Sequence, residues 1–272
     1  MEGTSPVLWQ IDARGVARVE FNRPHVNNAY DGALIDGILA TLNALSTAAG
    51  LRAVVLSGRG RHFQAGADLQ WIRQVREQDM AANVRASRMT AEAIRRLGAV
   101  SVPTIALVQG ACFGGGTGIV AACDVVVAAE NAVFSIAEVR WGLTAAIIIP
   151  QLSDAIGVRQ VRRYAVTGER FDAKEARRIG LVHEVVPPGQ LLEAGERVVG
   201  HVLENGPEAI RETKSITCDG ERKPLTAEQF DALIIGHAAK RCSEEAGEGL
   251  ASFVEKREAS WVTHHARRND AT

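Results

Sequence analysis

The glycine-rich segment at residues 111–118 has the residue types that can hold a negatively charged oxygen. Glycines leave backbone N–H groups unshielded, and a helix is expected to begin at about Gly116, so that its dipole adds to these donors. Such donors stabilise an oxyanion, for example the enolate of a thioester. Unusual backbone angles explain a glycine-rich turn equally well, so the segment needs a second element beside it.

Residues 60–69 supply that second element. They follow residues 51–58, which read as a buried strand, and they precede a long helical pattern. The turn leaves the N–H group of Ala67 free. If the two strands lie in neighbouring layers, the N–H groups of Ala67 and Gly115 can converge on one carbonyl oxygen and form an oxyanion hole.

Hydrophobic periodicity places both turns in a chain of alternating strands and helices. The expected strands are residues 7–11, 16–22, 54–57, 104–109, 124–129, 134–136 and 181–186, and the expected helices are residues 30–45, 69–97 and 116–122. After Pro187 and Pro188 the pattern is almost entirely helical to Trp261. We therefore expect a core at residues 1–187 and a helical region at residues 188–272.

Composition excludes several classes of function. The chain has 272 residues and a formal net charge of −1, so nothing indicates binding to nucleic acid. No apolar run approaches the ~20 residues that span a membrane, and no export signal is visible. The four cysteines lack metal-ligand spacing and lie mostly in apolar segments. We expect a cytoplasmic protein with reduced, buried thiols and no metal site.

The order and spacing of several motifs resemble the crotonase, or enoyl-CoA hydratase/isomerase, superfamily over about residues 7–261. The motifs are Asn22-Arg23-Pro24 with Asn28-Ala29, Ala65-Gly66-Ala67-Asp68-Leu69, Cys123-Asp124, Thr167-Gly168, Ala173 with Ala176, and residues 110–116, 134–138, 180–182, 185–187 and 253–257. The resemblance implies an α/β fold, a spiral of ββα turns with C-terminal helices used for trimer contacts. It also implies a homotrimer or dimer of trimers whose substrate is an acyl-CoA, with no further cofactor because coenzyme A is part of the substrate.

The resemblance assigns roles to individual residues. Glu138 delivers or removes the α proton. The alternatives for Glu138 are a solvated turn residue or a partner of Arg140. Gly118 stands where typical crotonases carry a second glutamate that helps to activate water. Contacts with coenzyme A and the thioester fall on Arg23, His25, Val26, Ala65, Asp68, Leu69, Gln70, Phe253 and Lys256, the last two often supplied by a neighbouring subunit. Asp68 also suits a helix N-cap, which is its more ordinary role.

Three functions are compatible with these residues. Hydration of an enoyl-CoA comes first. Isomerisation of an enoyl-CoA is the second, because a 1,3-proton shift needs only one carboxylate. A non-catalytic binding protein is the third, although such a protein has no reason to keep Ala67, Gly115 and Glu138 together.

The segment Gly-Gly-Gly-x-Gly combined with Glu-Val-Arg-x-Gly-Leu resembles the bacterial branch that hydrates 3-branched glutaconyl thioesters. The expected substrates are methylglutaconyl-CoA or isohexenylglutaconyl-CoA, in the breakdown of leucine or acyclic terpenes. The apolar residues 144–150 are either core or a wall for the acyl chain. Candidate cations for the acyl carboxylate are Arg73, Arg76, Arg85 and Arg88.

Overall fold

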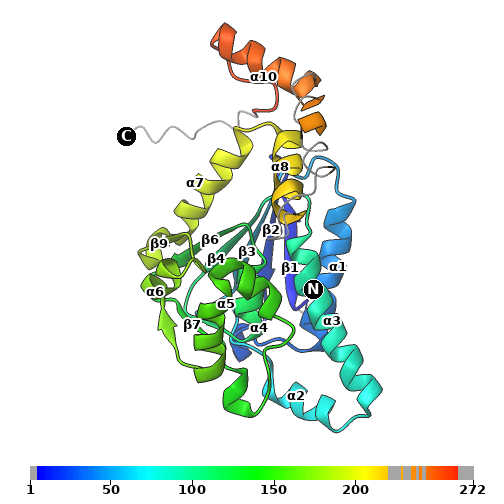
Figure 1. Ribbon diagram of the computed structural model, residues 1–272, viewed down its shortest axis with the longest axis vertical. Helices are drawn as coiled ribbons and strands as arrows, with labels where there is room; N and C mark the ends of the chain where they lie inside the picture. Colours follow the sequence, from blue (N-terminus) through cyan, green and yellow to red (C-terminus); the bar gives the residue numbers. More distant parts are fainter. Residues whose placement is uncertain (1–4, 220–227, 229–233, 237–238, 241–242, 263–272) are drawn as a thin grey trace.

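The computed structural model describes residues 5–219, 228, 234–236, 239–240 and 243–262 (Figure 1). Its main sheet has the strand order β1-β2-β3-β4-β6-β9, in which β1 and β2 form an antiparallel hairpin and the other neighbours are parallel. The strands are β1 (Val7–Ile11), β2 (Val16–Phe21), β3 (Ala53–Gly58), β4 (Thr104–Val108), β6 (Val125–Ala129) and β9 (Glu184–Val186). The sequence predicted each of these strands to within a few residues.

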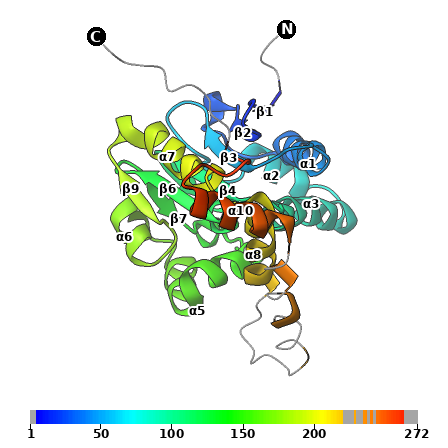
Figure 2. The ribbon, with the colours of Figure 1, turned by 90° about the horizontal axis from the view of Figure 1, so that it is seen from above.

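Helices cover both faces of this sheet, because alternate residues of its parallel strands are apolar on both sides. Val54 and Leu56 of β3 pack into the larger core cluster, and Val55 packs into a second one. The larger cluster lies under α1 (Gly32–Ser46), α3 (Met80–Gly98), α4 (Gly115–Ala121) and α5 (Ile149–Thr167), and α7 (Leu191–Leu203) covers the second. Figure 2 shows α7 on one side of the sheet and α1 with α3 on the other. The predicted α/β class is confirmed.

A small second sheet lies beside the first and contains β5 (Ala111–Phe113), β7 (Val133–Ser135) and β8 (Phe171–Asp172). β5 and β7 are parallel, with Phe113 opposite Ser135. Single backbone bridges join Gln64 to Cys112 and Tyr30 to Ala67. We call these three pairings the backbone ladder. The ladder brings four turns that are far apart in the sequence to one place.

The prediction of a single helix over residues 69–97 is wrong. The structure has α2 (Leu69–Arg76) and α3, separated at Glu77–Asp79. Asp79 is the N-cap of α3 and accepts a hydrogen bond from the Ala82 N–H, 2.7 Å long. The Asn83 side chain donates to Val75 O at the end of α2, 2.8 Å away. These two side chains satisfy backbone groups at the break, so the chain can turn there.

The described residues after β9 form helices only, as predicted: η3 (Pro188–Gln190), α7, α8 (Pro207–Asp219) and α10 (Glu244–Glu255). α7 contributes Leu191, Ala194 and Val199 to the core, so this part of the 188–272 region covers the sheet. The role of that region in assembly stays a prediction. α10 lies at the end of the molecule opposite α2 (Figure 1).

The described residues bear on three further points. Cys112 and Cys123 are free and buried, as expected, whereas the side chains of Cys218 and Cys242 lie outside the described part. None of the described helices is both long and apolar enough to cross a membrane. Within the same residues, no three metal-ligating side chains gather into a group.

Candidate active site

A cavity of about 740 Å³ lies between the small sheet, α2, α3 and the short helix η2 (Glu138–Trp141). Its lining combines residues 65–67, residues 113–115 and Glu138. These are the three segments that the sequence singled out. The volume is in the range of small-molecule binding sites, about 300–1,000 Å³.

The two expected oxyanion donors face this cavity from neighbouring turns. Gly115 is the first residue of α4, so its N–H has no acceptor within the helix. Among the described residues, no hydrogen bond is formed by the N–H of Ala67 or of Gly115. Gly66 and Gly114 precede them with φ of +93° and +50°, which favours glycine at both positions. The geometry leaves both amides available to an anionic oxygen.

Gln64 joins the two turns, and sequence reasoning missed it. Its fully buried side chain donates to Gly66 O (3.1 Å) and accepts from the Gly66 N–H (3.0 Å). Its backbone N–H donates to Ala111 O, and its carbonyl accepts from the Phe113 N–H. The only available signal is a polar residue inside an apolar turn, which is typical of a buried side chain with backbone partners.

Glu138 follows β7 at the start of η2, where the parallel pairing of β5 and β7 places it beside Gly114. A Cβ on Gly114 would lie 3.1 Å from Glu138 Oε1. Glu138 Oε2 is buried and has no hydrogen-bond partner among the described residues. Burial raises the pKa of this carboxyl, and a hydrogen bond from its own backbone N–H partly opposes the rise. A buried carboxylate with a free oxygen is suited to proton transfer.

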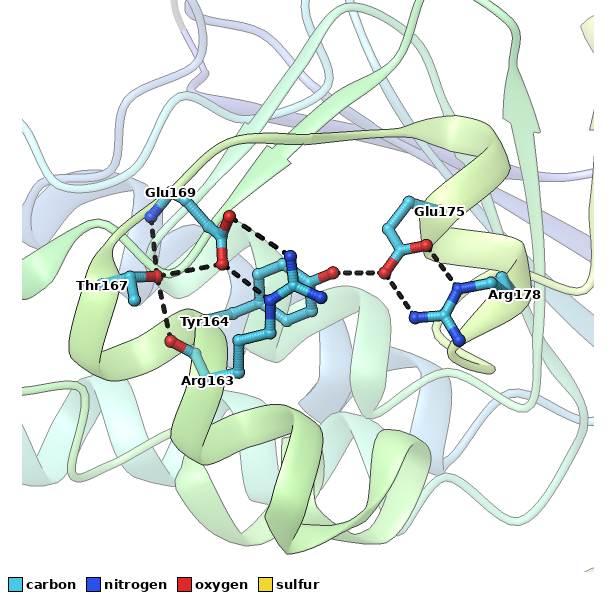
Figure 3. Close-up of polar contacts among 6 residues, drawn as sticks. All are labelled: Arg163, Tyr164, Thr167, Glu169, Glu175 and Arg178. Carbon is cyan, nitrogen blue, oxygen red and sulfur yellow. Dashed lines mark hydrogen bonds and ion pairs between the residues drawn. The ribbon is translucent and has the colours of Figure 1, made fainter.

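The pairing of Glu138 with Arg140 is not found among the described ion pairs. Arg140 Nε instead donates to Gly168 O over 2.8 Å, and the Ser135 hydroxyl donates to the same oxygen over 3.0 Å. Gly168 has φ of +61° and ends α5. A polar network surrounds this helix end (Figure 3), in which Arg163 bonds Glu169 and Tyr164 donates to Glu175. The pKa of Glu175 is lowered to about 2, mainly by its hydrogen bonds with the Arg178 guanidinium.

Ile148 fills the space of the missing second glutamate. Gly118 is buried in α4, and a Cβ there would lie 2.3 Å from Ile148 Cγ2. The Ile148 side chain is only 1% exposed and also lines the cavity. The lining of the cavity is therefore apolar at Ile148.

Gly118→Glu is expected to lower the free energy of unfolding by more than the ~1–3 kcal/mol of ordinary overpacking, because it also buries a carboxylate. Gly118→Glu/Ile148→Ala should recover part of the loss. Gly200→Glu is the matched control, since a Cβ there meets no atom within 4 Å. Urea unfolding measures all three. Equal stability of the Gly118 and Gly200 variants would show that Ile148 does not occupy this space.

Arg23 is committed to two carboxylates. Its Nη2 lies 2.9 Å from Asp31 and 3.2 Å from Asp68, which are the N-caps of α1 and α2. Asp68 accepts from the backbone N–H groups of Gln70 and Trp71, so its role as a cap is confirmed. Arg23 thus holds two helix starts together, and its contact with coenzyme A stays a prediction.

The structure brings some of the other predicted residues to the cavity. Ala65 and Leu69 line it, Gln70 is exposed one residue further on, and His25 and Val26 lie on the short helix η1 (Pro24–Val26). Lys256 is exposed after α10, at the other end of the chain, and the Phe253 side chain lies outside the described residues. A contribution of these two residues from a neighbouring subunit stays a prediction.

The arginines that line the cavity differ from those expected. Of the four candidates, Arg76 alone belongs to the lining. Arg140 and Arg170 line it as well and were missed, because Arg140 lies on η2 and Arg170 lies between α5 and β8, far in the sequence from the candidates on α2 and α3. The Arg170 guanidinium lies 5.3 Å from the centre of the Phe113 ring.

Comparison with known proteins decides the family. A family model described as enoyl-CoA hydratase/isomerase matches residues 12–264. The chain belongs to the enoyl-CoA hydratase/isomerase family. This membership, together with relatives named as enoyl-CoA hydratases, confirms the predicted enzyme class and agrees with the acyl-CoA substrate that the resemblance implied.

Relatives of this enoyl-CoA hydratase/isomerase family member cover nearly the whole chain. The mevalonyl-coenzyme A hydratase sidH of Aspergillus fumigatus is 35% identical over 88% of this chain and 88% of its own. The 2,3-dehydroadipyl-CoA hydratase of Escherichia coli is 31% identical over 89% and 93%. A solved enoyl-CoA hydratase from Shewanella pealeana has a TM-score of 0.89 and 32% identity over 94% and 96%. These likenesses confirm the crotonase-type fold.

Proposed function

We propose that this enzyme adds water across the 2,3 double bond of a 3-branched glutaconyl-CoA, either methylglutaconyl-CoA or isohexenylglutaconyl-CoA. The observation that carries the proposal is the contact between Gly118 and Ile148. Where a second glutamate would give the cavity a polar wall beside the reacting carbons, Gly118 and Ile148 give it an apolar one. Breakdown of leucine or of acyclic terpenes would supply such thioesters.

Catalysis would use the groups that face the cavity. The N–H groups of Ala67 and Gly115 would hold the thioester oxygen as enolate character develops, each contributing about 2.7–4 kcal/mol. Glu138 would take one proton from water as the water oxygen bonds to C3, and would then deliver that proton to C2. The product carries hydroxyl on C3 and hydrogen on C2, and Glu138 returns to its carboxylate form.

The lining of the cavity supports a branched acyl group that ends in a carboxylate. Ala146, Ile147 and Ile148 line one wall, while Ala145 is buried in the core. The segment at residues 144–150 therefore serves both as core and as wall. Arg76, Arg140 and Arg170 are the cations available to an acyl carboxylate.

The names of two relatives agree with this chemistry. One acts on a mevalonyl thioester, whose acyl group is branched at C3, and the other on 2,3-dehydroadipyl-CoA, whose acyl group ends in a carboxylate. Both features meet in a 3-branched glutaconyl thioester. Each feature of the proposed acyl group is therefore already present in the substrate named for one of these two relatives.

Competition between thioesters in one reaction is the test. We expect kcat/KM for a branched glutaconyl-CoA to exceed that for crotonyl-CoA by at least about 10-fold, the ratio that one or two well-placed pocket contacts give. Absorbance of the conjugated thioester and mass spectrometry of the products measure both rates. If crotonyl-CoA wins, the branched assignment is abandoned and a general enoyl-CoA hydratase remains.

Isomerisation is the second candidate, because Glu138 is the single acidic residue among the described residues that line the cavity. A 1,3-proton shift needs only that group. The same absorbance assay separates the two reactions, since hydration of a 2-enoyl-CoA removes conjugation and isomerisation of a 3-enoyl-CoA creates it.

We also propose assembly as a homotrimer or dimer of trimers, with cytoplasmic location. The position of α10 at the end of the molecule opposite α2, a helix that lines the cavity, supports assembly, because Lys256 follows α10 and would then serve a neighbouring copy. Light scattering that gives a stable, active monomer would contradict it.

A further inference from the structure

Tyr30 lies between the two oxyanion amides. Its backbone N–H donates to Gly66 O (2.9 Å), and its carbonyl accepts from the Asp68 N–H (2.8 Å), so its main chain brackets Ala67. Its ring packs against Gly115, because a Cβ on Gly115 would lie 2.6 Å from Tyr30 Cε1 and 3.3 Å from its hydroxyl oxygen. The phenol is thus held between the two turns that carry the donors.

The Tyr30 ring is fixed and borders the cavity. It is partly buried against the larger core cluster and contacts the ring of Trp71 edge to face, with centres 5.9 Å apart. Both rings line the cavity together with Glu138. A side chain that is packed on two sides and open on the third keeps its polar tip in one position.

The Tyr30 hydroxyl is free to bind a ligand, unlike the hydroxyls of the two buried residues Thr90 and Ser135 in the lining. Thr90 Oγ1 donates to Ala86 O and Ser135 Oγ donates to Gly168 O, each over 3.0 Å. Within the described part of the chain, Tyr30 Oη forms no hydrogen bond. Burial, and then the charge of Glu138, raise the pKa of Tyr30, so the phenol stays neutral and can both donate and accept.

Addition of water needs two groups to orient one molecule. Glu138 can accept one hydrogen of the water, and the position that would accept the other in a two-glutamate site is filled by Gly118 and Ile148. We propose that Tyr30 is the second catalytic residue of this hydratase and accepts that hydrogen bond through its phenol oxygen. The inference rests on the proposed role of Glu138 as the base.

The proton balance needs no change in Tyr30. One water proton goes to Glu138 and then to C2, and the water oxygen with its remaining hydrogen becomes the hydroxyl on C3. Tyr30 holds that remaining hydrogen in place and gives up no proton. The phenol therefore matters for the addition of water and not for the exchange of an α proton, which involves only Glu138 and the two amides.

Tyr30→Phe tests the inference, because it removes the hydroxyl and keeps the ring against Gly115. We expect kcat for hydration of crotonyl-CoA and of methylglutaconyl-CoA to fall about 10- to 100-fold, the loss of one positioned hydrogen bond, with KM little changed. Exchange of the α protons of butyryl-CoA with D₂O, followed by NMR, should stay within about 2-fold of wild type. Tyr164→Phe is the matched control, since its phenol bonds Glu175 outside the cavity.

Two results would overturn the inference. If Tyr30→Phe kept the wild-type kcat for hydration, the phenol would not be the group that holds the water. Equal losses of hydration and of α-proton exchange would make Tyr30 a third oxyanion donor instead. If Glu138 is not the base, Glu138→Gln will keep its rate of α-proton exchange. Failure of the proposed function can thus be distinguished from failure of the inference on Tyr30. Thermal unfolding confirms that each variant is folded.

Discussion

Glu138→Gln is expected to lower kcat by about 10²–10⁴-fold while KM for the acyl-CoA changes little. The amide keeps the size of the side chain and cannot take a proton from water. Glu138 Oε2 has no hydrogen-bond partner among the described residues, so the replacement breaks no contact there. Steady-state kinetics and binding of a non-reactive acyl-CoA measure the two effects. A near-wild-type rate would exclude Glu138 as the base.

The same variant has an expected signature in stability. The pKa of Glu138 is raised by burial above its ordinary value of 4.5, so the folded state binds the proton more tightly than the unfolded state. As pH rises from 4.5 through the raised pKa, the buried carboxylate ionises and the folded protein loses stability. Glu138→Gln avoids this loss. Its melting temperature should exceed that of wild type near neutral pH, and the difference should shrink as pH falls toward 4.5.

The activity of the wild-type enzyme, unlike its stability, should fall as the pH decreases on the acid side of the profile. The base works in its ionised form, so kcat/KM should fall as pH drops through the raised pKa of Glu138. The acid limb of the profile should therefore lie above pH 4.5. A limb at or below the ordinary glutamate value would contradict the burial of this carboxyl in the working enzyme.

Ala67→Pro is the second large effect that we expect. Proline removes the one backbone N–H that Ala67 offers, and no described residue accepts a hydrogen bond from it. Removing one oxyanion donor costs about 10²–10³ in kcat. Kinetics on the preferred thioester, with melting temperature as the test of folding, measure the loss.

Ala67→Val is the matched control for this variant. Valine adds bulk at the same position and keeps the N–H. The proline variant should lose at least about 10-fold more kcat than the valine variant, because only proline removes the donor. Equal losses in the two would assign the effect to bulk and would leave the Ala67 amide without a role.

Local signals were enough to predict the segments of the site. Free amides at Ala67 and Gly115 follow from glycines that precede helix starts, whereas the role of Glu138 was implied by the family resemblance of the segment in which it lies. The cap at Asp68 is also a local feature. The break at Asp79 carries the same kind of signal, an aspartate before a helical run, but the strong periodicity on both sides hid it.

Contacts between distant segments could not be predicted in this way. Gly118 and Ile148 are each visible in the sequence, yet their contact depends on how α4 packs against α5. Tyr30 reads as the start of a helix, and only the pairing with Ala67 makes it part of the site. Arg140 and Arg170 reach the cavity through the small sheet, of which the sequence indicated β7 but not β5 or β8, because strands of two or three residues show little periodicity.

The backbone ladder has a consequence for changing this enzyme. Main-chain pairings hold the turns that carry Ala67 and Gly115, the proposed oxyanion donors, so replacing other side chains that line the cavity should leave the position of those donors intact. Some residues that border the cavity take part in none of the three pairings of the ladder, among them Val75 on α2, Ala86 on α3 and Ile147 before α5. Directed evolution of acyl specificity can therefore be confined to such positions, where mutational libraries should retain a high fraction of folded, active clones.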